Sequence, residues 1–323
     1  MISRANPGSP VPVGPAASGA HADAGTDAPA GGRPAAGADR PLVVAILGTG
    51  SMGTAVLRGL TGPEAGPAEI RVTTRSAAHA AALGGQDGVT SYAVESDPDA
   101  NRLAARGADL VVLAVKPHLI PGLAGEIGDV IDAHTIVVSV AAGVAIATIA
   151  GRLPAGVAVL RAMPNTPAVI GRGVTGLSVT GGRGSAAALR VVHDLFARVG
   201  EVVEVPEDRL DALSAVSGSG PAYVFLLIEK LTAAAVRLGF AEREAARLVA
   251  GTFRGAAELL AAGEAAPAEL RRQVTSPHGT TERAIAVLEE AGLDDLFGRA
   301  LEAALARARE LAAEGASRSA PEA

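Results

Sequence analysis

The spacing of three glycines near residue 50 is the first feature that predicts chemistry. Gly48-Thr49-Gly50-Ser51-Met52-Gly53 fits the pattern GxGxxG, and it lies between the apolar run 42–47 and the amphipathic stretch 54–60. In a strand-turn-helix context the first glycine permits a tight turn, the second lets backbone N–H groups approach a pyrophosphate, and the third lets the helix pack closely. The helix N-terminus adds positive potential. These six residues are therefore predicted to bind a dinucleotide cofactor.

A second set of glycines has the same spacing but a different context. Gly171, Gly173 and Gly176 run directly into the strand-like sequence VTGLSV, with no helix behind it. The pattern alone is weak evidence in a chain with 40 glycines. We predict no cofactor role for this second set.

The end of the predicted second strand indicates which dinucleotide is bound. An NAD-specific fold carries Asp or Glu about twenty residues after the glycines, whereas this chain reads Thr73-Thr74-Arg75-Ser76. Arg75 and Ser76 can bind the 2′-phosphate of NADPH, although Arg75 can also be an ordinary solvated arginine. We predict NADPH, with NADH possible.

Lys116 stands at the carboxyl end of another predicted strand, in Ala114-Val115-Lys116-Pro117-His118. Ligands of open α/β sheets bind at such ends, and lysine is rare here, since Lys230 is the only other one. The alternative is a simple turn lysine. No role is assigned to His118.

A hydroxyl-rich loop near the C-terminus is predicted to bind an anion. The segment 274–281, VTSPHGTT, precedes a predicted helix over 282–290. Free backbone N–H groups and hydroxyls at a helix start suit a carboxylate. An ordinary helix N-cap is the alternative, and one threonine suffices for that.

Charge and composition exclude several function classes. The 323 residues include 28 Lys and Arg against 34 Asp and Glu, a net charge of −6, which disfavours a nucleic-acid surface. The chain has no cysteine and six scattered histidines. We therefore predict no metal site and no cysteine nucleophile.

The order of predicted elements divides the chain in two. Apolar strands over 42–47, 69–74, 109–115, 135–140, 157–162 and 174–179 are interleaved with helical stretches, which predicts an α/β domain with a doubly wound parallel sheet over 41–205. Residues 206–314 are predicted to be all-helical. The polar, Gly- and Pro-rich segment 1–40 and the end 315–323 are expected to be disordered.

No targeting or membrane segment is predicted, so a cytoplasmic location is expected. The longest charge-free run, 135–151, is shorter than a bilayer-spanning helix and contains Gly143. The predicted helix 221–238 is apolar around most of its circumference. Such a helix is buried on all sides, either between two subunits or against the α/β domain of its own chain.

Several segments together resemble the delta-1-pyrroline-5-carboxylate reductase family. They lie in order and cover essentially all of 41–314: VAILGTGSMGTAVLRGL (44–60), LAVKPHLI (113–120), VVSVAAGV (137–144), RAMPNTPAVIGRGVTGLS (161–178), SGSGPAYVFLLIEKL (217–231) and LRRQVTSPHGTTERAIAVLEE (270–290). The resemblance implies a Rossmann-type NADPH domain followed by an all-α dimerisation domain. It also implies interlocked homodimers, often assembled further, in which the partner's helical domain completes the active site.

The resemblance also implies individual roles. Cofactor contacts would come from Gly48 to Gly53, Arg75, Ser76, Asn101, Ala114, Val115, Lys116, Ala141, Ala142 and Gly143, with Asn101 near the adenosine ribose. The substrate, 1-pyrroline-5-carboxylate, would contact Ser276, Gly279, Thr280 and Thr281. This chain departs from the family at His278, where a glycine or alanine is usual; a positive φ there would strain the histidine.

Reduction of a cyclic imine to proline requires a hydride at carbon and a proton at nitrogen. The nicotinamide supplies the hydride, and we expect Thr281 to donate a hydrogen bond beside the nitrogen. Glu264 is a second candidate, to stabilise the iminium charge, or else a solvated turn residue. Asn165 and Thr166 either orient the nicotinamide or build their turn.

Two other functions are compatible with the pattern. A hydroxyacid dehydrogenase of the same fold needs a catalytic Lys or His in the helical domain, where only Lys230, inside an apolar helix, and His278 occur. A non-catalytic NADPH sensor should lack a second polar site such as 276–281.

Overall fold

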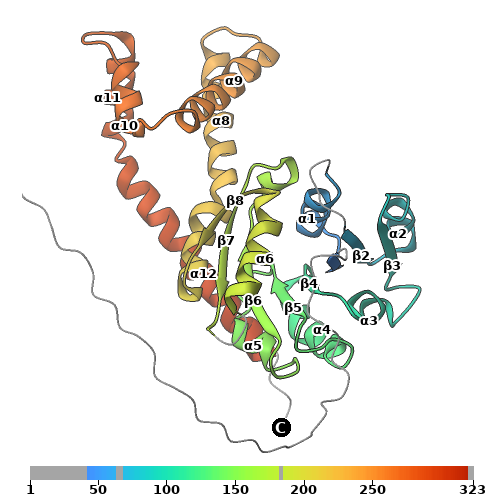
Figure 1. Cartoon of the computed structure of the whole chain (residues 1–323). Helices are drawn as coiled ribbons and strands as arrows, with labels where there is room; N and C mark the ends of the chain where they lie inside the picture. The colour runs from blue at the N-terminus through green and yellow to red at the C-terminus, as the bar shows by residue number, and fades with distance from the viewer. Residues whose placement is uncertain (1–41, 63–67, 182–184, 319–323) are drawn as a thin grey trace, which may run out of the picture.

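The computed structural model describes residues 42–62, 68–181 and 185–318, and Figure 1 shows how their elements are arranged. The segment 1–40, expected to be disordered, lies outside the described residues. An eight-stranded sheet with the order β3-β2-β1-β4-β5-β6-β7-β8 forms the first part. Its strands are β1 (Leu42–Leu47), β2 (Ala68–Thr74), β3 (Val89–Ala93), β4 (Leu110–Leu113), β5 (Ile136–Ser139), β6 (Ala158–Met163), β7 (Gly173–Val179) and β8 (Gly200–Glu204).

One pair of strands departs from the predicted parallel sheet. β7 runs antiparallel to β6, while every other neighbouring pair in the described sheet is parallel. Only residues 164–172 connect the two strands, and they form a single 3-10 turn (Thr166–Ile170). A parallel return needs a crossover of a dozen or more residues, so this short connection reverses the direction.

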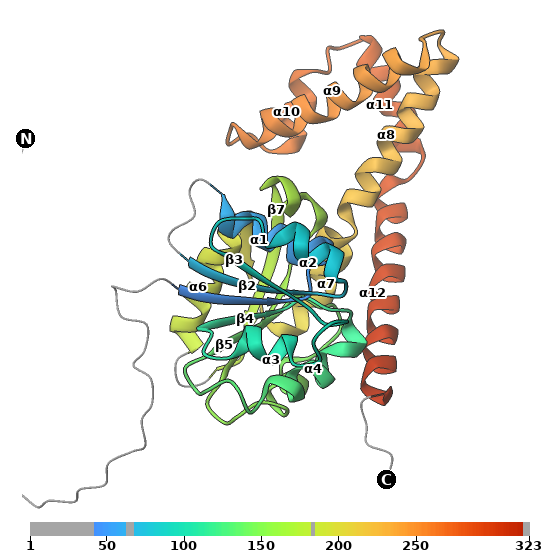
Figure 2. The same ribbon diagram turned by 90° about the vertical axis from the view of Figure 1, so that its right-hand side faces the viewer.

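The sheet is covered by helices on both faces (Figure 2). Val44 and Ile46 point to one face, where α1 (Ser51–Thr61), α2 (Ala77–Leu83) and α6 (Ser185–Ala197) pack. Val43 and Leu47 point to the other, which α3 (Ala100–Ala105), α4 (Ile120–Ile127) and α5 (Ile146–Ala150) cover. Alternate residues of one apolar strand thus reach two cores, as a doubly wound sheet requires.

The short elements β3, α2 and α3 are not predicted from the sequence. Each has seven residues or fewer, and the two helices are rich in alanine, with the sequences AAHAAAL and ANRLAA. Elements this short show too few periods of hydrophobicity to be recognised.

The second part is helical. It contains α7 (Leu210–Leu213), a π-helical turn (Ser214–Gly218), α8 (Gly220–Arg237), α9 (Glu242–Ala261), α10 (Pro267–Gln273), α11 (Thr280–Glu290) and α12 (Leu293–Arg318). α8 leads away from the sheet domain, and the long α12 returns to it (Figures 1 and 2). Disorder was expected from residue 315 to residue 323, but residues 315–318 continue α12. Residues 319–323 lie outside the described part.

Helix α8 is not buried within its own chain. None of its residues is buried, and its exposed apolar side chains include Phe225, Leu226 and Leu231. Of the two alternatives for this helix, packing against the α/β domain of its own chain is therefore wrong. By length and composition alone, the helical stretch Glu207–Arg237, which is 6% buried, could cross a membrane. One such helix is weak evidence for a membrane span.

Buried polar side chains join the sheet to the helical part. Arg161 of β6, 7% exposed, contacts Glu207 at 3.2 Å and Asp211 at 3.5 Å. Glu207 also accepts a hydrogen bond from the backbone N–H of Ile146 at the start of α5 (2.7 Å). Since losing one partner of a buried ion pair costs about 3–5 kcal/mol, these contacts fix where the helical part begins.

Candidate functional site

The loop between β1 and α1 has the geometry that its glycines predict. Gly48 has φ 100°, and a Cβ there would lie 2.9 Å from the carbonyl oxygen of Ala114. A Cβ on Gly53 would lie 2.0 Å from the carbonyl oxygen of Gly48, so the helix packs against the turn itself. A Cβ on Gly50 would meet no atom within 4 Å. The first and third glycines are needed by the fold, and the second leaves open space where a pyrophosphate fits.

Hydrogen bonds attach this loop to the neighbouring strand. The N–H of Gly48 donates to the hydroxyl oxygen of Thr73 (3.0 Å), and the hydroxyl of Thr49 donates to the carbonyl oxygen of Thr73 (3.2 Å). Both threonines are buried. Ser51 and Met52 begin α1. The turn is thus held before any ligand arrives, which lowers the entropic cost of binding.

The second glycine set has packing roles. Gly171 has φ 69° and ends a 3-10 turn, and a Cβ on Gly173 would lie 2.8 Å from the Cβ of Ala168. A Cβ on Gly176 would lie 2.6 Å from a methyl group of Leu213. Each glycine is therefore explained without a cofactor.

Arg75 and Ser76 follow β2, which is parallel to β1. They therefore lie at the same carboxyl edge of the sheet as the glycine loop. Arg75 is exposed and makes no hydrogen bond or ion pair with its side chain in the described chain. The hydroxyl oxygen of Ser76 accepts from the N–H of His79 (3.3 Å) and caps α2. A free guanidinium beside a capping hydroxyl fits a phosphate.

A carboxylate that the sequence reading missed lies beside them. Glu95, two residues after β3, accepts a hydrogen bond from the N–H of Ala77 through Oε1 (2.6 Å). The end of β2 itself carries no carboxylate in the sequence, but β3 pairs with β2, and the chain that follows β3 brings Glu95 there.

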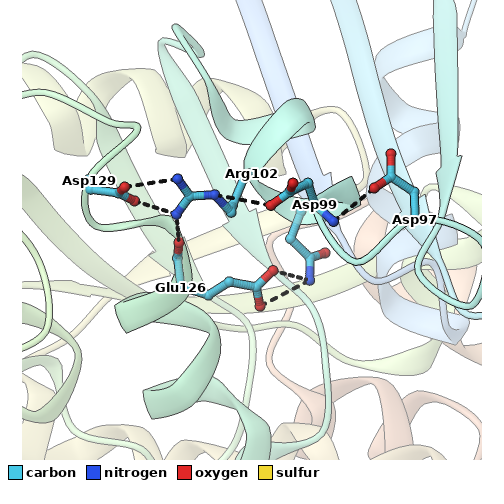
Figure 3. Close-up of polar contacts among 6 residues, drawn as sticks. Asp97, Asp99, Arg102, Glu126 and Asp129 are labelled. Carbon is cyan, nitrogen blue, oxygen red and sulfur yellow. Dashed lines mark hydrogen bonds and ion pairs between the residues drawn. The ribbon is translucent and has the colours of Figure 1, made fainter.

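Asn101 lies on α3 and contacts α4. Its Nδ2 donates to both carboxylate oxygens of Glu126, at 3.1 and 3.3 Å. Next to it Arg102 forms a two-pronged pair with Asp129 (2.6 and 2.8 Å) and approaches Asp99 at 3.4 Å (Figure 3). The hydrogen bond with Arg102 holds the pKa of Asp129 below its ordinary value, and the same bond raises the pKa of Arg102.

Lys116 and Gly143 lie at the carboxyl ends of the adjacent strands β4 and β5. Lys116 is exposed, and Gly143 has φ 73°. Next to both is a cavity of about 430 Å³ between the sheet edge, the π-helical turn and α12. Its lining includes His118, Ala142, Gly143, Asp211, Ser214 and Arg307. The remaining predicted cofactor residues, Ala114, Val115 and Ala141, adjoin these strand ends.

The predicted substrate loop forms the start of α11. Gly279 is the N-cap residue, and no side chain caps the helix. The N–H groups of Thr280 and Thr281 have no backbone acceptor in the described chain. Ser276 makes the turn, since its carbonyl oxygen accepts from the N–H of Gly279 (3.0 Å). A helix start with unsatisfied donors attracts a carboxylate.

His278 has φ 60°, the one positive value among the described non-glycine residues. Its N–H donates to Oε2 of Glu282 (3.0 Å), which fixes the turn. The departure from glycine or alanine therefore falls at a left-handed position, where histidine is tolerated but strained.

Several predicted residues are not brought together within one chain. Glu264 and Thr281 lie beyond opposite ends of α10, which spans about 10 Å at 1.5 Å per residue. Residues 224–290 form no hydrogen bond or ion pair with the described part of the sheet domain. The substrate loop and the glycine loop of one chain are thus separate.

Asn165 builds its turn. Its Nδ2 donates to the carbonyl oxygen of Ser217 (3.0 Å), and its Oδ1 accepts from the N–H of Val174 (2.8 Å). Both ends of the amide are used inside the chain. Among the described residues there is no group of three or more potential metal ligands.

Comparisons with known proteins match this arrangement. Residues 207–311 match the family model for pyrroline-5-carboxylate reductase dimerisation, and residues 43–143 match that for NADP oxidoreductase, coenzyme F420-dependent. The pyrroline-5-carboxylate reductase of Corynebacterium melassecola is 42% identical over 272 residues, which are 83% of this chain and 98% of the relative.

This chain belongs to the pyrroline-5-carboxylate reductase family. The relative from Pseudomonas aeruginosa is 37% identical over 270 residues, 83% of this chain and 96% of its own length. The structure of the Coxiella burnetii reductase has a TM-score of 0.75 at 38% identity and covers 83% of this chain and 97% of its own. The Plasmodium falciparum pyrroline carboxylate reductase, solved with NADP bound, shares the fold at 24% identity, with a TM-score of 0.70 over 84% and 98% of the two chains.

Proposed function

We propose that this protein reduces 1-pyrroline-5-carboxylate to L-proline with NADPH, the last step of proline biosynthesis. Membership of the reductase family over nearly the full length of its relatives carries this conclusion. The open space at Gly50, between two glycines that the fold requires, supports dinucleotide binding at this loop. Neither a hydroxyacid dehydrogenase nor a non-catalytic sensor has comparable support.

The proposed cofactor residues follow the carboxyl edge of the sheet. The backbone of 48–53 would hold the pyrophosphate, and Arg75 and Ser76 the 2′-phosphate. Asn101 would contact the adenosine ribose, and the strand ends 114–116 and 141–143 the nicotinamide half. NADPH supplies a hydride when it is bound. NADH is proposed as a weaker substitute.

The start of α11 is proposed to bind the substrate. The N–H groups of Thr280 and Thr281, with Ser276 and Gly279 shaping the turn, would hold the carboxylate. The Thr281 hydroxyl would then donate a hydrogen bond to the ring nitrogen, next to the carbon that is reduced. Proximity and orientation of this kind provide much of the rate in such reactions. Glu264, in the α9–α10 turn, is the second candidate to stabilise the iminium charge. Because it lies beyond the opposite end of α10 from Thr281, it would face the same substrate only from a second subunit.

A second copy of the chain is proposed to complete the site. Helix α8 exposes apolar side chains along its length, and residues 224–290 form no hydrogen bond or ion pair with the described residues of their own sheet domain. Interlocked homodimers, with assembly into larger oligomers possible, would bury α8 and bring the α11 loop of one subunit to the cofactor of the other. We propose that a second subunit, not a membrane or a nucleic acid, covers this apolar surface.

We propose that the NADP-binding domain spans 41–205 and the dimerisation and substrate domain spans 206–314. The cytoplasm is the proposed location, because a reductase of a small metabolite depends on a pool of reduced nicotinamide cofactor.

The test follows absorbance at 340 nm as NADPH is oxidised with 1-pyrroline-5-carboxylate. Thr281→Ala removes one hydrogen bond to the reacting system, which predicts a 10- to 100-fold loss of kcat/KM at roughly 1.5–3 kcal/mol. Thr252→Ala is the matched control, since within the described chain that hydroxyl donates to the carbonyl oxygen of Leu248 on its own helix α9. Absence of turnover in wild-type protein that binds NADPH would refute the proposed reaction.

A further inference from the structure

The chain after β3 crosses the carboxyl end of β2. Thr74 of β2 pairs with Ala93 of β3, and the N–H of Val94 then donates to the carbonyl oxygen of Thr74 (2.9 Å). The N–H of Glu95 donates to the carbonyl oxygen of Arg75 (3.1 Å). The backbone of Glu95 is thus fixed beside Arg75 by a continuation of the sheet.

The side chain of Glu95 turns toward the first residue of α2. Its Oε1 accepts from the N–H of Ala77 (2.6 Å), and the side chain is otherwise exposed. A carboxylate therefore takes up the backbone N–H that follows Ser76.

The end of β2 is where a dinucleotide-binding sheet distinguishes its cofactors. A carboxylate there accepts hydrogen bonds from the ribose 2′-hydroxyl, whereas an arginine binds the 2′-phosphate. This protein carries both groups on adjacent strand ends: Glu95, and Arg75, whose side chain makes no hydrogen bond or ion pair in the described chain.

We propose that Glu95 is a specificity-determining residue that opposes the 2′-phosphate of NADPH and accommodates the ribose diol of NADH. The inference rests on the proposed dinucleotide binding at 48–53. A 2′-phosphate near Arg75 meets a like charge at Glu95 and competes with it for the N–H of Ala77. The uncharged diol meets neither penalty and donates to the same carboxylate.

The other charged groups of this loop do not relieve the repulsion. Asp97 and Asp99 follow Glu95, and Oδ1 of Asp97 accepts from the N–H of Asp99 (2.9 Å). Residues 94–99 contain no Lys or Arg. Arg75 thus attracts the 2′-phosphate at this strand end, and the negative charge of Glu95 reduces that attraction.

The experiment compares the dissociation constants of NADP⁺ and NAD⁺ by calorimetry in wild type, Glu95→Gln and Glu201→Gln. Glutamine keeps an acceptor for Ala77 and removes the charge. Two like charges on exposed groups 4–6 Å apart repel each other by about 1 kcal/mol. Glu95→Gln should therefore lower the dissociation constant of NADP⁺ about three- to tenfold relative to that of NAD⁺. Glu201→Gln makes the same change on β8, at the opposite edge of the sheet, and should leave the ratio unchanged.

The outcomes separate this inference from the proposed function. An unchanged ratio in Glu95→Gln, with both nucleotides still bound, overturns the inference and leaves the reductase assignment standing. Failure of wild-type protein to bind either nucleotide overturns the proposed function and this inference with it. The gain in Glu95→Gln should also shrink as KCl is raised, since screening weakens charge repulsion between exposed groups; a salt-independent gain would refute the electrostatic cause.

Discussion

Phe225 provides a direct test of how the apolar surface of α8 is covered. This residue is 65% exposed in the single chain, and Leu226 and Leu231 on the same helix are also exposed. Monomeric proteins rarely leave large contiguous apolar patches in water. Phe225→Asp introduces a charge into this patch and should separate the subunits.

The size of the effect follows from the area. A phenylalanine contributes about 200 Å² of surface, so the exposed part of Phe225 is roughly 130 Å², worth about 3 kcal/mol at 25 cal/mol per Å². A two-fold symmetric interface contains the residue twice, which gives about 6 kcal/mol per dimer. That corresponds to a dissociation constant weakened by about four orders of magnitude, before the cost of desolvating the aspartate.

Sedimentation equilibrium over a range of protein concentrations measures the association. Wild-type protein should remain a dimer or larger oligomer at micromolar concentration, and Phe225→Asp should be a monomer. Leu103→Asp is the matched control, because Leu103 is an exposed apolar residue of α3, on the sheet domain; it should leave the association unchanged.

The monomeric variant should still bind NADPH but lose turnover, because the glycine loop and the α11 loop of one chain do not meet. A Phe225→Asp protein that stays fully associated at nanomolar concentration would refute the assignment of α8 to the interface. A folded monomer with full activity would refute the proposal that two subunits build one active site.

Four other substitutions test the site and the surface. Gly53→Ala should lower stability by about 1–3 kcal/mol and also lower NADPH affinity, because the new Cβ would lie 2.0 Å from a carbonyl oxygen. Gly50→Ala, whose Cβ would meet no atom within 4 Å, should lower NADPH affinity alone. Thermal melts with and without NADPH distinguish the two variants, and equal melting points without NADPH would contradict the packing argument. His278→Gly should raise stability by up to about 1 kcal/mol by relieving a left-handed φ of 60°, measured by denaturant titration, and a loss of stability would show that the side chain makes a compensating contact. Asp129→Asn should reduce stability at pH 7, and the loss should shrink as the pH is lowered below 3.8, because the stability that a lowered folded pKa contributes is lost as the pH falls through that pKa. A loss that stays constant as the pH is lowered would contradict the pairing with Arg102.

The sequence was most informative where local rules govern. The turn after β1 requires glycine at 48 and 53 on steric grounds. The glycine spacing identified this turn because it lies between an apolar strand and an amphipathic helix. The start of α11 was recognisable from its hydroxyls, and the strain at His278 from its departure from a small residue. Short elements such as β3 and α3 were missed because they contain too few hydrophobic periods.

What the sequence predicted by itself was the chemistry of each segment: a dinucleotide turn, a helix start suited to an anion and an apolar helix that needs a partner surface. The tertiary structure decided which segments meet. It placed Glu95 beside Arg75, although twenty positions separate them, because the β2–β3 register sets that proximity. It reversed β7 because a nine-residue connection cannot cross the sheet, and it left α8 without cover in its own chain. Contacts between distant segments depend on backbone pairing and packing over the whole domain, which no local pattern of residues encodes.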